Sequence, residues 1–136
     1  MKNNLIKMLS GTLLFALFST SCSLPDDNKD NCVQVIGVAT DGVVGPVEAT
    51  IDQEITLNVT YKIAASCGEF YIFSEQTVSS TEKKVAILAT YDVCNCNNVY
   101  TTKTQPYKFK VATAGVYSLK FATENNAFIT HVITVE

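Results

Sequence analysis

Strict alternation of apolar and polar residues is the feature that most restricts what this chain can fold into. In residues 55–63 every odd position is apolar and every even position is polar. Successive side chains of a strand point to opposite faces, so this pattern predicts a strand with one buried face and one wet face. Similar alternation recurs in residues 84–93, 105–112 and 116–122. No window has the period of an amphipathic helix, so we expect an all-β protein.

Turn-forming residues divide the chain into about seven predicted strands. Pairs that contain Gly, Pro or Asn separate the apolar segments. The second predicted strand is a short piece followed by a long one. We expect the strands at residues 33–39, 47–63, 69–77, 84–93, 105–112, 116–122 and 127–135. Short strands joined by turns, without helices, predict a single antiparallel β-sandwich.

Residues 114–119, Ala-Gly-Val-Tyr-Ser-Leu, resemble the entry into strand F of immunoglobulin-like (Ig-like) domains. In those domains a Tyr lies two residues before a buried core position and forms the tyrosine corner. The resemblance assigns the Tyr to Tyr117 and the core position to Leu119. It implies an Ig-like sandwich over residues 32–136. The core Trp of antibody domains has no counterpart, because the chain contains no Trp.

The N-terminal residues have the order of an export signal. Lys2 and Lys7 provide a basic start, residues 8–18 are predominantly apolar, and three small polar residues precede Cys22. This order is typical of a secretory signal peptide. The apolar run is too short to span a hydrocarbon core of about 30 Å comfortably. We therefore expect residues 1–21 to be a signal that is removed.

The Ser-Thr-Ser-Cys ending of this signal resembles that of bacterial lipoproteins of the Bacteroidota type, in which cleavage precedes a Cys that carries diacylglycerol. The resemblance implies that Cys22 is the lipidated first residue and anchors the protein at the outer membrane or cell surface. Several acyl chains bind strongly, since each buried CH₂ contributes about 0.8 kcal/mol. Residues 22–31 are polar and are expected to form a flexible tether to the domain at 32–136.

The charge of the chain restricts its partners. All ten basic residues are Lys and two of them lie in the predicted signal, so residues 22–136 carry eight Lys against thirteen acids, a formal charge of −5. Nucleic-acid binding usually requires a basic surface, so no nucleic-acid partner is expected. Contact with a membrane is expected through the lipid on Cys22, since an acidic surface gains nothing from anionic headgroups.

Four further cysteines are the most informative residues of the domain. They are Cys32, Cys67, Cys94 and Cys96. In an exported protein an even set of cysteines predicts disulfides. If successive strands alternate in direction, all four lie at one end of the sandwich. We expect Cys67 to pair with Cys94 and Cys32 with Cys96. The exchanged pairing stays open, because Cys94 and Cys96 are two residues apart.

A metal site is the alternative for these cysteines, since a C-x-C sequence places two thiolates within reach of one ion. The single His, His131, is predicted mid-strand and away from the cysteines, as a residue satisfied by a hydrogen bond. The mature chain has no Met that could supply a thioether ligand. Disulfides are therefore favoured, and no metal or other cofactor is expected.

The sequence predicts a binding or structural role and no catalysis. No nucleophile can be assigned together with a base and an orienting acid. We expect a non-catalytic, lipid-anchored module whose partner is another envelope protein or a glycan. A carbohydrate-binding accessory lipoprotein is the main alternative, and a small metal-binding protein that uses the cysteines is a third. Since three of the six tyrosines are expected in the core, the candidate sugar contacts are Tyr71, Tyr100 and Tyr107.

Overall fold

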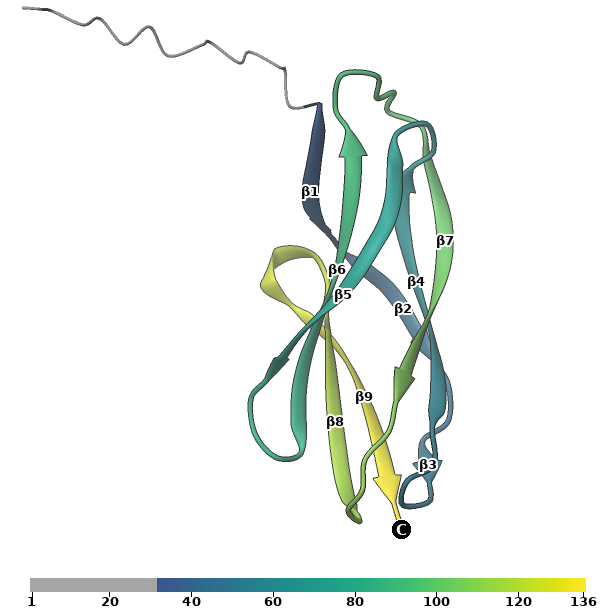
Figure 1. The fold of residues 1–136 in the computed structure, drawn as a ribbon, viewed down its shortest axis with the longest axis vertical. Helices are drawn as coiled ribbons and strands as arrows, with labels where there is room; N and C mark the ends of the chain where they lie inside the picture. Colours follow the sequence, from purple (N-terminus) through teal and green to yellow (C-terminus); the bar gives the residue numbers. More distant parts are fainter. Residues whose placement is uncertain (1–31) are drawn as a thin grey trace, which may run out of the picture.

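The computed structural model describes residues 32–136, whose regular secondary structure is almost entirely β-strand (Figure 1). This confirms the prediction of an all-β protein. The strands are β1 (Val33–Val38), β2 (Thr40–Val44), β3 (Glu48–Ala49), β4 (Ile55–Ala64), β5 (Gly68–Thr77), β6 (Glu82–Asp92), β7 (Tyr100–Phe109), β8 (Gly115–Ala122) and β9 (Phe128–Val135). One short 3₁₀ turn, η1 (Glu124–Asn126), precedes β9. In the described residues no helix is long and apolar enough to cross a membrane.

The strands form two sheets with the core between them. The smaller sheet is antiparallel and has the order β2-β4-β7. The larger sheet has the order β1-β6-β8-β9-β3. Strand β5 pairs with β6 along nearly its whole length, so β1 and β8 share the opposite edge of β6. The β6–β8 and β3–β9 pairs are parallel, which makes this sheet mixed.

The structure therefore differs from the predicted seven-stranded antiparallel sandwich. Strand β2 was expected to be a turn because it contains Asp41-Gly42. A register shift between Thr40 and Gly42 accommodates these residues within a strand paired to β4. Strand β7 begins at Tyr100, earlier than expected, because its first half pairs with β4 although most of its side chains are exposed. Both segments are strands because their backbones pair with β4, and this pairing requires no alternation of apolar and polar side chains.

Alternate residues of facing strands build the core, as their periodicity predicted. In β4 the five odd-numbered residues from Ile55 to Ile63 are all buried. Strand β8 contributes Phe121, whose ring meets that of Tyr107 edge to face with centroids 5.4 Å apart. Aromatic pairs of this geometry contribute about 0.5–1.5 kcal/mol beyond their burial. The core is thus contributed by both sheets.

Tyr117 and Leu119 occupy the buried positions predicted for them in β8. The Tyr117 hydroxyl donates a hydrogen bond to the Thr113 carbonyl oxygen at 2.9 Å. It also lies 2.7 Å from the Thr113 hydroxyl. The bond ties the start of β8 to the chain four residues upstream, as in a tyrosine corner.

Candidate functional site

The four cysteines of the domain lie together at one pole, where β1 and β5 begin and β6 ends (Figure 1). The structure pairs Cys32 with Cys94 and Cys67 with Cys96, with Cα–Cα distances of 5.2 and 5.1 Å. The cysteines thus form two disulfides, as predicted. The favoured pairing was wrong, and the exchanged pairing, which the sequence left open, is present.

The path of the chain after β6 explains this pairing. At the end of β6 the Asp92 amide donates to the Cys67 carbonyl at 3.0 Å, and the next amide, that of Val93, donates to the Cys32 carbonyl on the other side at 2.7 Å. Beyond Cys94 the chain lies beside the β4–β5 loop, where the Asn97 amide donates to the Ser66 hydroxyl at 3.2 Å. Cys94 therefore lies on the β1 side of β6, and Cys96 lies on the β5 side.

A metal-ligand cluster also lies at this pole. One ligand atom each from Cys32, Asp92 and Cys94 lies within 4.8 Å of the others. Thiolates are the ligands that zinc and Cu(I) prefer, but here the two sulfurs are bonded to each other. In the disulfide form the cluster offers only the Asp92 carboxylate. It already accepts hydrogen bonds from the Cys94 amide at 3.2 Å and the Asn95 side-chain amide at 3.0 Å.

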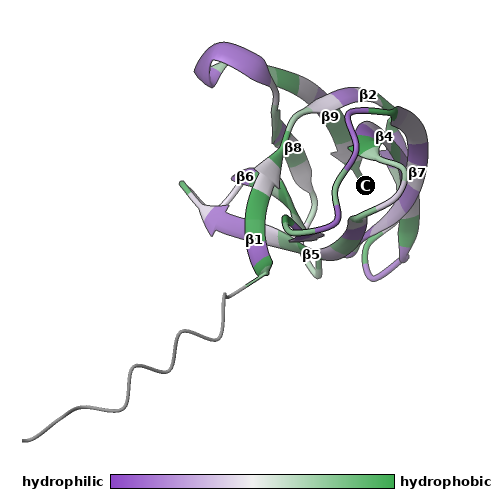
Figure 2. Cartoon of the chain, turned by 90° about the horizontal axis from the view of Figure 1, so that it is seen from above, coloured by the Kyte–Doolittle hydropathy of each residue, from purple (hydrophilic) through white to green (hydrophobic). Residues whose placement is uncertain are grey.

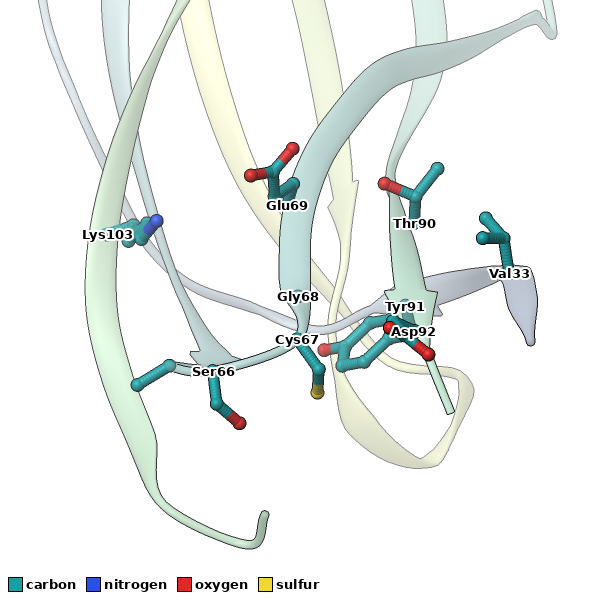
Figure 3. A pocket seen from close by; sticks show the side chains of 10 residues that line it. Val33, Ser66, Cys67, Gly68, Glu69, Thr90, Tyr91, Asp92 and Lys103 are labelled. Carbon is teal, nitrogen blue, oxygen red and sulfur yellow. The ribbon is translucent and has the colours of Figure 1, made fainter. Parts of the chain in front are cut away.

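A shallow hollow of about 330 Å³ opens beside the Cys67 disulfide (Figure 3). Its charged groups have mixed sign, because Glu69 and Asp92 face it together with Lys103. It contains no free thiol and no histidine. The lining residues are Val33, Ala65, Ser66, Cys67, Gly68, Glu69, Thr90, Tyr91, Asp92 and Lys103.

A second hollow, of about 320 Å³, lies between β5 and β7, the outer strands of the two sheets, and we call it the aromatic groove. A register shift between Phe70 and Ile72 inserts Tyr71 as an extra residue of β5, and Tyr71 is 60% exposed. The Phe73 and Tyr107 rings meet edge to face, with centroids 5.2 Å apart. The lining residues are Phe70, Tyr71, Ile72, Phe73, Glu75, Gln105, Pro106, Tyr107 and Lys108.

Glu75 is the polar centre of the aromatic groove. Its Oε1 accepts a hydrogen bond from the Tyr107 hydroxyl at 2.8 Å, and its Oε2 accepts one from Lys83 Nζ at 2.8 Å. Burial favours a higher pKa for Glu75, but hydrogen bonds from Lys83 and Tyr107 outweigh it and lower the pKa below its usual range. Burial, reinforced by the Glu75 carboxylate, raises the pKa of Tyr107. The groove thus holds an ionised carboxylate beside a protonated phenol.

The structure separates the three tyrosines that were candidate sugar contacts. Tyr71 and Tyr107 both line the aromatic groove, but Tyr107 is buried, at 3% exposure, and Tyr71 is exposed. Tyr100 is equally exposed, at 62%, but lines a different hollow with Lys62 and Asp41. Of the three tyrosines expected in the core, Tyr61 and Tyr117 are buried and Tyr91 is only partly buried, whereas Tyr107, kept as a candidate contact, is buried. Periodicity carried no signal for the bulge that aims Tyr71 outward.

Two other predicted residues have different outcomes. His131 lies partly buried on β9, and its Nε2 donates a hydrogen bond to the Pro46 carbonyl oxygen at 2.9 Å. The predicted hydrogen-bonded histidine is thus present. Cys22, the predicted lipidation site, lies outside the described residues.

Comparison with known proteins adds no further assignment. No protein-family model matches the chain, and no curated protein or solved structure shows significant similarity to it. The fold and its surface define a disulfide-bonded β-sandwich with an aromatic groove between the outer strands of its sheets.

Proposed function

We propose that this protein is a lipid-anchored, non-catalytic Ig-like binding module of the outer membrane or cell surface. The observation that carries the proposal is the position of the Cys32–Cys94 disulfide. The predicted tether from Cys22 joins the domain directly before Cys32, which this disulfide ties to the end of β6. In a domain anchored by an N-terminal lipid, any force on the tether acts at Cys32. The disulfide transmits this force to β6 in the larger sheet and keeps the edge strand β1 from fraying.

Strand pairing supports the Ig-like part of the proposal. Strand β4 pairs with β7, as strand B pairs with E in Ig domains, and β8 pairs with β9, as F pairs with G. The bond from Tyr117 to the Thr113 carbonyl has the form of a tyrosine corner. The arrangement departs from the Ig pattern at β6, which lies between β5 and β8 and runs parallel to β8.

Replacing the predicted lipidation residue tests the anchor. Cys22→Ser removes the sulfur that would carry diacylglycerol, so we expect the protein to leave the membrane fraction or to accumulate as uncleaved precursor. The measurement is fractionation of cells followed by mass spectrometry of the N-terminus. Ser23→Ala, one residue on, serves as the control and is expected to stay anchored. A Cys22→Ser protein that is cleaved and anchored like the wild type contradicts the proposal.

A second function, glycan binding, is favoured by the aromatic groove. Ligand sites are typically apolar, with a few placed polar groups that orient the ligand. The groove combines the exposed Tyr71 ring with the Glu75 carboxylate, the Gln105 amide and Lys108. An amphipathic aromatic face suits the C–H surface of a sugar ring, and the polar groups suit its hydroxyls. The ligand proposed for this groove is a neutral oligosaccharide.

Two equally exposed tyrosines provide a matched test of glycan binding. On an array of neutral oligosaccharides, we expect Tyr71→Ala to weaken binding about tenfold, which corresponds to the loss of about 1.4 kcal/mol. Tyr100→Ala removes a ring of similar exposure from another hollow and should leave binding unchanged. Titration calorimetry on the best ligand measures both. No glycan ligand at all, or equal loss in both variants, would exclude the groove as the site.

A further inference from the structure

The free strand edges of the domain are not equally protected against pairing with another chain. Exposed edges are usually blunted by bulges, charges, Pro or shortness. Strand β2 contains a register shift and Asp41, and β3 has two residues. Strand β5 contains a register shift and Glu69, and β7 contains Pro106 and Lys108. The free part of β9 is flanked by the segment leading to β3, to which His131 is hydrogen-bonded.

Strand β1 has none of these devices. Its sequence, Val-Gln-Val-Ile-Gly-Val, contains no charged residue and no Pro, and its register with β6 is uninterrupted over all six residues. It pairs with β6 alone in the described part of the chain. Every second residue of β1 therefore turns its backbone N–H and C=O to the free edge, where these groups have no strand partner. Val33, Val35 and Ile36 are 58%, 55% and 40% exposed. Figure 2 shows β1 at the outside of the larger sheet.

Strand β1 is also held in place, which distinguishes it from a frayed terminus. The Cys32–Cys94 disulfide fixes its first end to the end of β6, and the Val93 amide donates to the Cys32 carbonyl at 2.7 Å. Its other end continues into β2 of the smaller sheet, where Thr40 is fully buried. An edge fixed at both ends is a preformed template, so a partner strand does not have to order it.

The surroundings of β1 define the chemistry of a partner strand. Asp92 lies opposite Val33 at one end, and Glu124 lines the hollow that borders Gly37 at the other. Among the described residues neither acid is in an ion pair. A Cβ added at Gly37 would meet no atom within 4 Å, so the outer face beside it has room for a large side chain.

We propose that the open edge of β1 is a docking site for an extended segment of another polypeptide, bound by β-strand addition. The segment has aliphatic residues against Val33 and Val35, an aromatic residue beside Gly37 and basic residues at its ends. Main-chain hydrogen bonds provide affinity in this mode, and alternate side chains provide specificity. Since β1 and β5 lie on opposite edges of β6, the site is separate from the aromatic groove.

Charge argues for another polypeptide and against a second copy of this chain. Two β1 strands paired antiparallel would bring the Asp92 end of one copy to the Glu124 end of the other. Both ends are acidic, so the copies would place like charges together, which destabilises pairing. A basic-ended strand converts the same two positions into attractive contacts.

A designed peptide tests the proposal. The probe is Lys-Phe-Thr-Val-Thr-Val-Lys, labelled for fluorescence anisotropy, and its antiparallel docking places Phe beside Gly37 and a Val beside each of Val35 and Val33. We expect saturable binding to the purified protein. Residues 33, 35 and 37 turn their backbone groups to the open edge, because the Val93 amide bonds to the Cys32 carbonyl and the pattern alternates from there. The control peptide is methylated on the backbone nitrogens of Phe and both Val, which removes the donors that face these residues and keeps the side chains and charge. It should bind at least about tenfold more weakly. Hydrogen exchange should slow at the β1 amides when the probe is bound.

Two valine variants locate the binding site. Val35→Lys places a cation on the edge against a basic peptide and should weaken binding at least about tenfold. Val132→Lys makes the same change at a 46% exposed position on β9 of the same sheet and should leave binding within about twofold of the wild type. No saturable binding, equal binding of the N-methylated peptide or equal loss in both variants overturns the proposal. A dimer by light scattering that the probe does not dissociate also overturns it, because the occupant would then be a second copy.

Discussion

Replacement of both Cys32 and Cys94 by serine is expected to lower the free energy of unfolding by about 4 kcal/mol. The bond joins residues that are 62 positions apart, and in the chain-entropy model a loop of this length restricts the unfolded chain by about that amount. The Cys67–Cys96 bond closes a separation of 29, so its removal should cost about 3.5 kcal/mol. Guanidinium denaturation of the two double variants measures both effects.

The location of the loosened structure distinguishes the two disulfides. Removing the Cys32–Cys94 bond frees the start of β1, so hydrogen exchange should accelerate first at residues 33–38. Removing the Cys67–Cys96 bond should accelerate exchange first in the loops that border β5. Thiol counting on the unfolded, unreduced wild-type domain should find no free thiol among these four cysteines. Fragmentation mass spectrometry that links Cys32 to Cys96 would contradict the pairing on which this prediction depends.

The second large effect is expected in the core of β8. Leu119→Ala should lower the free energy of unfolding by about 2–5 kcal/mol, because it leaves a cavity among packed side chains of both sheets. Leu119 is 1% exposed and belongs to the single core cluster formed by the buried residues. Thermal or denaturant unfolding measures the change.

Lys120→Ala is the neighbouring control for that experiment. The sequence predicted a solvent-facing side chain, whereas Lys120 is partly buried and pairs with Glu82 at 2.9 Å. Each side chain of the pair keeps about a third of its surface exposed, so the expected cost is under about 1 kcal/mol. Equal destabilisation by Leu119→Ala and Lys120→Ala would contradict the orientation of β8 in which Leu119 faces the core and Lys120 does not.

Features that depend only on residues close together in the chain could be predicted from the sequence. Alternation over residues 55–63 identified the buried face of β4, because a strand sends successive side chains to opposite sides. The same reasoning placed Leu119 in the core. The number of cysteines and their positions at strand ends predicted a disulfide-bonded pole, which the structure contains. Each of these inferences needs only the direction of a side chain or the end of a strand.

Features that depend on which strands lie side by side could not be predicted from the sequence. The disulfide partners were set by Cys32 and Cys67 lying on opposite sides of the end of β6. The aromatic groove is lined by residues of β5 and β7, which belong to different sheets and are brought together by the fold. The open edge of β1 exists because β1 has one neighbour where an inner strand has two. Side-chain periodicity records burial and carries no information on the identity of the neighbouring strand, so these sites appear only in the folded chain.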